Sequence, residues 1–439
     1  MDAPIRRRRP FTYLRNVMFQ LLRSSLLLSS YYQELSLLEF LQFEEDNPRK
    51  KRKIAPRRWY IRPWVMTRPD QGQYEQLMPL LRTGDPETYR KYLRVEPEMF
   101  HELLERIKPH ITKIDTNYKL AIEPGLKLAC TLRFLATGND YIALSFNFLV
   151  ASNTISKFVP VVCEAIIHEF MRETIVIPTT PEGWLEIAQD FLAKWNFHHT
   201  IGAIDGKHIA IVNSPRGGSL YYNYKGYHSV VLLALSDAHG RFLYVDVGAR
   251  GSGSDGGVFN VTPLRDALER DVAGVPDPEP LPGETVPVPY FIVGDNAFPM
   301  RKFLQKPYGV RNPTRRERNF NYRLSRARRV VENAFGMLAA RFRLFLTTIN
   351  VLPQTVEKLV LTACILHNML RNRCPNMYPL PDIDHALPTT WHLNPLHGRE
   401  HPQGRGPNEA KRVREHLADF YMRDTTFRRP PRPAPDDEA

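Results

Sequence analysis

The chain has 439 residues, of which 43% are hydrophobic and 24% are charged, and its formal net charge is +13. That length predicts about two to three domains, with at least one sizeable core. The four cysteines lie in or beside apolar helical patterns and lack C-x-x-C spacing, which argues against a disulfide scaffold or a zinc module and indicates a reduced, intracellular protein. The positive charge, to which basic tails contribute, favours a polyanionic partner such as nucleic acid.

The first 58 residues form a basic arm. Val17–Tyr32, which follows Arg6–Arg9, superficially resembles a signal peptide or a membrane anchor. Arg23 interrupts its apolar part, so we interpret it as an amphipathic helix; no other window approaches a spanning length, and we expect a soluble protein with no membrane partner. Residues 47–58, NPRKKRKIAPRR, are typical of a nuclear-import signal, so we expect action in the nucleus; a solvated charge run is the alternative.

Residues 85–175 follow a helical pattern and predict an all-α domain. A strong helix at Leu126–Leu135 is followed by a Gly-containing break, a short helix at Tyr141–Phe148 and a final helix at Thr154–Phe170. This order is typical of a helix-turn-helix DNA-binding domain, and a plain supporting bundle is the alternative that periodicity leaves open.

The last of these helices carries the candidate DNA contacts of the all-α domain. Ser152 or Asn153 is expected to cap it, and Pro160 is expected to kink or delay it. In a helix-turn-helix arrangement, the exposed residues that would meet DNA are Asn153, Ser156 and Lys157.

Residues 196–372 predict an α/β domain. Three apolar runs indicate a three-stranded antiparallel meander, at Thr200–Val212, Ser229–Ser236 and Phe242–Val247. Next come a helix over about 257–269 and a Pro-rich loop. They are followed by a strand at Tyr290–Asp295 and by two helices at Leu324–Leu338 and Thr355–Arg371. This order predicts a ribonuclease-H-like fold, a mixed five-stranded sheet with flanking helices. Residues 373–439 are expected to be mostly disordered, apart from one helix at Ala410–Met422.

Three acids of this domain are candidate metal ligands. Asp205 sits in the middle of the first apolar run, and a carboxylate in a strand buried on both faces is costly unless a cation meets it. Asp295 ends a second apolar run, and Glu332 lies in a helical pattern. Two Mg²⁺ or Mn²⁺ ions about 3.5–4 Å apart suit phosphodiester transfer. We expect Asp205 to bridge them and Asp295 and Glu332 to hold one each.

Each acid has a structural alternative when it is taken alone. Asp205 could equally cap a nearby backbone group, and Asp295 could be a turn residue at the end of a strand. Glu332 could form an ion pair with Arg328, four residues earlier on the same helix. The three together, in this fold order, are more specific than any one of them.

Other polar residues compete for a role at this site. Asp237 is explained by a turn, whereas Asp246 lies just before the glycine-rich stretch GARGSGSDGG and Asp255 lies within it, so either could approach the site as a neighbouring group. That stretch lacks the GKS or GKT ending of a phosphate-binding loop. Cys364 and His367 are three residues apart on a helix without a second pair, and we expect both in the core.

Arginine dominates the segment before and within the Glu332 helix. Only Glu317 is acidic between residues 311 and 329, and Phe320 and Tyr322 are interleaved. Such density suits contacts to DNA backbone phosphates. The candidate contacts are Arg315, Arg316, Arg318, Arg323, Arg326, Arg328 and Arg329, together with Lys207 beside Asp205.

Six ordered blocks resemble the PIF/Harbinger superfamily of DDE transposases and its domesticated nucleases. They include AIDGKHIAI, GSGSDGGVF, GDNAFP and CILHNML, and the likeness covers about residues 200–372, with a weaker helical similarity over 90–172. The resemblance implies a ribonuclease-H-like DDE domain, a divalent metal, and DNA cleavage with strand transfer in the nucleus. Asp205, Asp295 and Glu332 match the three acids of the family pattern.

The resemblance also implies partners. These are double-stranded DNA (transposon ends and an A/T-rich target), a separate Myb/SANT-like protein, and further copies of the chain in a homo-oligomer. The intact acids favour an active metal-dependent nuclease or transposase. The alternatives are a domesticated DNA-binding or scaffold protein that keeps the fold without cutting, and a ribonuclease-H-like nuclease that acts on RNA.

Overall fold

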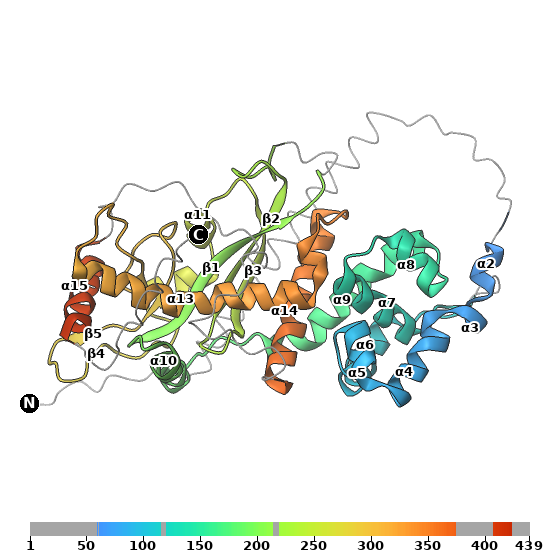
Figure 1. The fold of residues 1–439 in the computed structure, drawn as a ribbon, viewed down its shortest axis with the longest axis horizontal. Helices are drawn as coiled ribbons and strands as arrows, with labels where there is room; N and C mark the ends of the chain where they lie inside the picture. Colours follow the sequence, from blue (N-terminus) through green and yellow to red (C-terminus); the bar gives the residue numbers. More distant parts are fainter. Residues whose placement is uncertain (1–58, 60, 116–119, 214–218, 375–406, 424–439) are drawn as a thin grey trace, which may run out of the picture.

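The computed structural model describes residues 59, 61–115, 120–213, 219–374 and 407–423, and it contains an all-α part beside a mixed α/β part (Figure 1). The basic arm, its import-like cluster and most of the C-terminal tail lie outside the described residues. The helices of the all-α part are α2 (Pro63–Met66), α3 (Arg68–Gln71), α4 (Met78–Gly84), α5 (Pro86–Leu93), α6 (Pro97–Ile111), α7 (Pro124–Thr137), α8 (Tyr141–Phe148) and α9 (Ser152–Thr174), with a π-helical turn at Gln73–Leu77.

Local chemistry explains where these helices begin and end. Met99, Leu103 and Ile107 recur every four residues on α6 and are buried, as expected for the core-facing stripe of an amphipathic helix. Gly138 ends α7 in the left-handed conformation, with φ of 71°. Asp140 then caps α8, because its carboxylate accepts a hydrogen bond from the Ala143 backbone N–H at 2.7 Å.

The start of α9 differs from the prediction. Ala151 is the N-cap, and neither Ser152 nor Asn153 caps the helix through its side chain. The helix starts at Ser152 and continues through Pro160 to Thr174, so Pro160 does not delay it. Asn153, Ser156 and Lys157 are exposed near its first turns. Their role in DNA recognition stays a prediction, as does the helix-turn-helix interpretation of the all-α part.

A five-stranded mixed sheet forms the centre of the α/β part, as predicted. Its strand order is β3-β2-β1-β6-β7, with β1 antiparallel to β2 and parallel to β6. β1 and β2 are buried along almost their whole length because α10, α13 and α14 pack against the sheet. The strands are β1 (Thr200–Ala210), β2 (Ser229–Ser236), β3 (Phe242–Arg250), β6 (Phe291–Val293) and β7 (Leu304–Gln305), and β4 (Glu279–Pro280) pairs separately with β5 (Pro287–Val288).

The helices of this part refine the predicted boundaries. The helix expected over 257–269 is two helices, because Thr262 accepts a hydrogen bond from Arg265 N–H and starts a new one at Pro263. The Glu332 helix begins at Arg315, well before Leu324, because Thr314 and Glu317 form a capping box. The helices are α10 (Pro181–Trp195), α11 (Asp255–Phe259), α12 (Pro263–Glu269), α13 (Arg315–Arg341), a 3₁₀ turn at Arg343–Leu346, α14 (Pro353–Arg373) and α15 (Asn408–Arg423).

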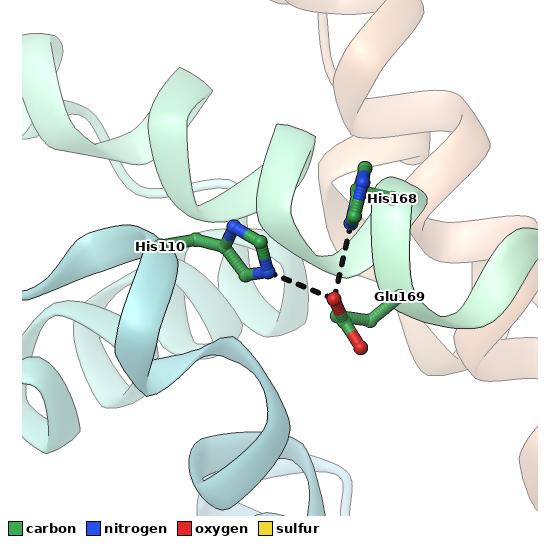
Figure 2. A group of neighbouring side chains, drawn as sticks. All are labelled: His110, His168 and Glu169. Atoms are coloured by element: carbon green, nitrogen blue, oxygen red, sulfur yellow. Dashed lines mark hydrogen bonds and ion pairs between the residues drawn. The ribbon is translucent and has the colours of Figure 1, made fainter.

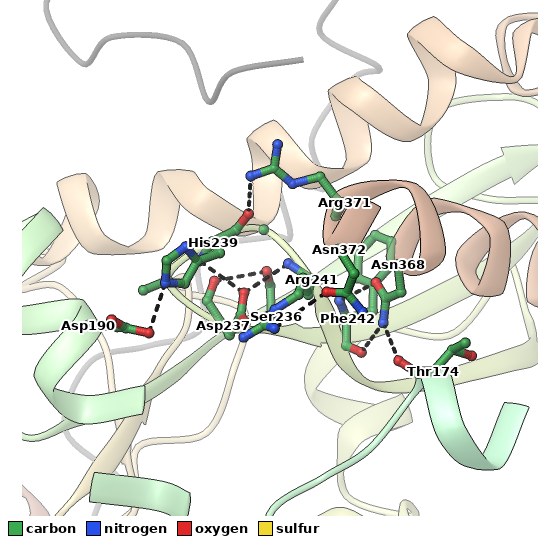
Figure 3. A network of polar contacts seen from close by, with 12 residues as sticks. Thr174, Asp190, Ser236, Asp237, His239, Arg241, Phe242, Asn368, Arg371 and Asn372 are labelled. Atoms are coloured by element: carbon green, nitrogen blue, oxygen red, sulfur yellow. Dashed lines mark hydrogen bonds and ion pairs between the residues drawn. The ribbon is translucent and has the colours of Figure 1, made fainter. Parts of the chain in front are cut away.

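Helix α14 joins the two parts of the molecule through buried polar contacts (Figure 3). The Asn368 side chain accepts from the Phe242 N–H at 2.9 Å and donates to the carbonyl oxygens of Phe242 and Thr174, each at 2.8 Å. One amide therefore ties α14 to β3 and to the end of α9. Asp237 occupies the β2–β3 turn, as predicted, and accepts hydrogen bonds from the backbone N–H groups of His239 and Arg241.

Helix α15, predicted at Ala410–Met422, packs on the α/β part against α13 and β7. Tyr421 is buried beneath the Arg323 guanidinium, which lies 4.6 Å from its ring centre, and its hydroxyl accepts from the His198 N–H at 2.8 Å. Arg316 pairs with Glu415 and Asp419 of α15, each at 2.5 Å. This segment of the tail is thus an integral layer of the α/β part.

Two further expectations concern cysteines and membranes. Cys130, Cys163, Cys364 and Cys374 form no disulfide, and His367 is buried with Cys364 as expected. Within the described ranges no single helix is both long and apolar enough to cross a membrane; α8 and α9 meet that test only as a pair, which is bent by 98°.

Candidate metal centre

The pairing of β1 with β6 brings Asp205 and Asp295 together. Ala203 is the partner of Val293 in this parallel pair. Asp205 lies two residues after Ala203, and Asp295 lies two residues after Val293. Residues two apart point to the same face of a sheet. The turn after β6 fixes Asp295, because its carboxylate accepts from the Ala297 backbone N–H at 2.8 Å. The two predicted strand acids are therefore neighbours.

Asp255 is the third acid at this place. It opens α11, and Ser254 caps that helix by accepting from the Gly257 N–H. Gly256 allows the close approach, since a Cβ there would lie 2.5 Å from the Ala297 carbonyl oxygen in the turn that carries Asp295. One carboxylate oxygen from each of Asp205, Asp255 and Asp295 lies within 4.8 Å of the others. These three residues are the acid cluster.

Burial and mutual repulsion make the acid cluster hard to ionise. Burial raises the pKa of Asp205 to about 7, although the nearby Arg328 opposes the shift. Burial, followed by the charges of Asp205 and Asp295, raises the pKa of Asp255 to about 8. Burial also raises the pKa of Asp295. Three acids in these surroundings need positive charge in order to stay ionised together.

Arg328 supplies part of that positive charge and connects Glu332 to the acid cluster. Its guanidinium lies 2.5 Å from a Glu332 carboxylate oxygen and 3.7 Å from an Asp205 oxygen. Burial would lower the pKa of Arg328, but the surrounding acids raise it above its ordinary value. The ion pair considered as the structural alternative for Glu332 is therefore present, and the same arginine places Glu332 beside the predicted site.

The acid cluster fits a divalent cation. Both carboxylate oxygens of Asp255 are buried and have no hydrogen-bond partner among the described residues. A buried, unpartnered carboxylate is costly, and a bound cation would relieve that cost. Carboxylate oxygens are also the ligands that Mg²⁺ and Mn²⁺ prefer. Asp205, Asp255 and Asp295 are thus the residues placed to hold such an ion, whereas Glu332 is paired with Arg328 and lies outside the acid cluster.

The sequence reasoning assigned Asp255 only a neighbouring position, together with Asp246. Asp246 instead lies within electrostatic range of Glu357 on α14 and outside the acid cluster. Asp255 stands in a glycine-rich loop that has no periodicity, so the pattern could not place it. The sequence feature that points to Asp255 is its position directly after the three-stranded meander, at the start of a short helix.

The predicted DNA-contacting residues of the α/β part fall into four groups. Arg315 and Arg318 are exposed at the start of α13, whereas Arg326 and Arg329 are partly buried. Arg316 and Arg328 are engaged by acids of α15 and of the candidate metal centre. Lys207 and Arg323 are buried, with exposures of 5% and 1%, because β1 is covered on both faces and α15 covers Arg323; neither presents its charge to a DNA backbone in this structure.

A five-stranded mixed sheet with flanking helices and a cluster of carboxylates is consistent with a DDE-type endonuclease domain. Residues 204–368 match the DDE superfamily endonuclease family. No solved structure matches the chain significantly.

Three relatives from animals and a plant are also similar to this chain in sequence. The chain is 26% identical over 258 residues to "Putative nuclease HARBI1" of Bos taurus, which covers 58% of this chain and 69% of that protein. It is 25% identical over 314 residues to the Mus musculus protein of that name, covering 69% and 81%. It is 25% identical over 299 residues to "Protein ALP1-like" of Arabidopsis thaliana, covering 65% and 71%. The resemblance to Harbinger-derived proteins is confirmed, and the matches support a nuclease or transposase-derived function.

Proposed function

We propose that this protein is a divalent-metal-dependent DNA endonuclease of the Harbinger type, which cuts phosphodiester bonds and joins DNA strands in the nucleus. The observation that carries the proposal is the buried acid cluster inside a DDE endonuclease domain. When bound there, Mg²⁺ or Mn²⁺ would activate a nucleophile and steady the leaving oxygen of the phosphodiester.

The chain's own residues have distinct parts in this proposal. Asp205, Asp255, Asp295 and Glu332 hold the ions, which extends the predicted set of three acids by Asp255. Arg328 keeps the Glu332 carboxylate beside Asp205 and balances negative charge before metal binds. The three buried or half-buried aspartates come from a central strand, a strand-end turn and a helix start, which are rigid positions for metal ligands.

DNA would lie over the acid cluster and be held through its backbone. The exposed arginines at the start of α13, Arg315 and Arg318, suit sequence-independent phosphate contacts. Asn153, Ser156 and Lys157 on α9 are exposed and are proposed as contacts of the all-α part. We also propose that the protein acts as a homo-oligomer on transposon ends and an A/T-rich target, and with a Myb/SANT-like partner.

The test is nicking of supercoiled plasmid by purified protein with Mg²⁺ or Mn²⁺. We expect cutting that is lost in Asp205→Asn, Asp295→Asn and Glu332→Gln, while DNA binding and thermal unfolding stay near wild-type. Cutting that survives in one variant removes that residue from the site. DNA binding without any cutting, even on Harbinger-type ends with the partner protein added, would favour the non-cutting scaffold function instead.

A further inference from the structure

A second group of metal-ligating side chains lies on the all-α part, away from the acid cluster (Figure 2). His110 comes from the last turn of α6, and His168 and Glu169 come from the C-terminal half of α9. One Glu169 carboxylate oxygen, Oε1, lies 2.8 Å from His110 Nε2 and 3.0 Å from His168 Nδ1. The three ligand atoms all lie within 4.8 Å of one another.

The surroundings of Glu169 leave this oxygen directed at the two imidazoles. The Arg106 guanidinium lies 3.6 Å from the other carboxylate oxygen, Oε2, and also donates to the Glu169 backbone carbonyl. Hydrogen bonds from the two histidines lower the pKa of Glu169, so its carboxylate is ionised at neutral pH. A carboxylate ligand held on its far side by a second group is a common feature of protein metal sites.

The ligand types differ from those of the acid cluster. Two imidazole nitrogens and one carboxylate oxygen are a common protein ligand set for Zn²⁺, with water completing the coordination. Ligand atoms about 2.0–2.1 Å from a tetrahedral ion are about 3.3 Å apart. The existing separations of 2.8 and 3.0 Å therefore need only a small outward movement of side chains, two of which are on the surface.

We propose that His110, His168 and Glu169 bind a single Zn²⁺ ion that links α6 to α9. The ion would replace the direct His–Glu hydrogen bonds with three metal–ligand bonds. Because α9 also packs on α14, which lies against β3, the ion would brace the all-α part close to its junction with the catalytic sheet. The proposal is independent of DNA cutting, since none of these residues belongs to the acid cluster.

The experiment is Zn²⁺ titration of the full-length protein in competition with a chromophoric chelator, with thermal unfolding followed in parallel. His110→Ala and His168→Ala are compared with His101→Ala, which removes another exposed histidine of α6. The C-terminal tail contains five more histidines, His385, His392, His397, His401 and His416. The decisive quantity is therefore the difference between each variant and the wild-type protein.

We expect wild-type protein to bind one more Zn²⁺ equivalent than His110→Ala or His168→Ala, and to gain thermal stability that these variants do not gain. His101→Ala should behave like wild-type. All three histidines are exposed, so the variants should fold, which circular dichroism checks. Equal Zn²⁺ binding in wild-type, His110→Ala and His168→Ala would overturn the proposal and leave an ordinary surface hydrogen-bond cluster.

Discussion

Arg328 and Glu332 form a 2.5 Å ion pair one turn apart on α13, and the same guanidinium reaches Asp205 on β1 at 3.7 Å. An arginine inside a carboxylate site has two consequences. It supplies positive charge to several buried acids in the metal-free protein, and it would compete with a bound metal for the oxygens of Asp205 and Glu332. We therefore expect folding and metal binding to be linked through this side chain.

Replacing Arg328 tests this link. Because Arg328→Gln leaves buried acids without their cation, we expect the metal-free protein at pH 8 to lose about 3 kcal/mol of unfolding free energy. Saturating Mg²⁺ should recover part of that loss, since metal supplies the missing charge. Urea unfolding with and without EDTA measures both effects. Arg315→Gln, an exposed neighbour on α13, is the control and should change little; an equal loss in both variants would contradict this role for Arg328.

The raised pKa of Asp255 predicts a pH-dependent stability change. A carboxyl whose pKa is higher in the folded than in the unfolded protein binds its proton more tightly when folded, so stability falls as pH rises from the unfolded value toward the folded value of about 8. The same sign applies to Asp205, whose folded pKa is about 7. The contribution of Asp205 acts between about pH 4 and pH 7, and that of Asp255 between about pH 4 and pH 8.

Asp255→Asn separates this effect from the other titrating groups. We expect the variant to unfold at a higher temperature than wild-type at pH 7 in EDTA, because it removes an acid that is costly to ionise. At pH 4.5, where Asp255 is protonated in the folded protein, the difference should become small. Scanning calorimetry at the two pH values checks this; a difference that does not change with pH would mean that Asp255 titrates normally.

Salt-dependent DNA binding should distinguish the arginines of α13. Arg315→Gln and Arg318→Gln should each weaken binding and reduce the log–log salt slope by about 1, because each removes one exposed phosphate contact. Arg316→Gln should leave the slope nearly unchanged, since Glu415 and Asp419 already engage that guanidinium. Fluorescence anisotropy over a range of salt concentrations measures the slopes. A larger effect of Arg316 than of Arg315 would show that α15 releases Arg316 to DNA.

Helix α15 should be required for the stability of the α/β part. Tyr421→Ala empties a fully buried position beneath Arg323 and removes the acceptor of the His198 N–H, so we expect a loss of about 3–5 kcal/mol. Met422→Ala, next to it and 40% exposed, is the matched control and should cost much less. Similar unfolding midpoints in urea for both variants would mean that α15 does not hold the α/β part together.

The sequence predicts the strands and helices of the α/β part well, because long apolar runs such as Thr200–Val212 admit few other interpretations. The sequence also identifies Asp205 and Asp295 as candidate site residues, since a charged side chain at or inside a buried strand needs a partner. It does not locate β7, whose two residues are too few to show a period. The positions of Asp255 and Arg323 are not predicted for a related reason: a non-local contact, with the β6 turn or with Tyr421, decides where each lies.

The most direct test of the acid cluster is Mn²⁺-dependent nicking of supercoiled plasmid by Asp255→Asn beside Asp246→Asn. Both variants remove one carboxylate charge from the same stretch of chain, and the structure places only Asp255 with Asp205 and Asp295. We predict that Asp255→Asn loses at least two orders of magnitude of nicking rate while Asp246→Asn keeps most of it, with DNA binding retained in both. Full nicking by Asp255→Asn would contradict a catalytic centre built on these three aspartates.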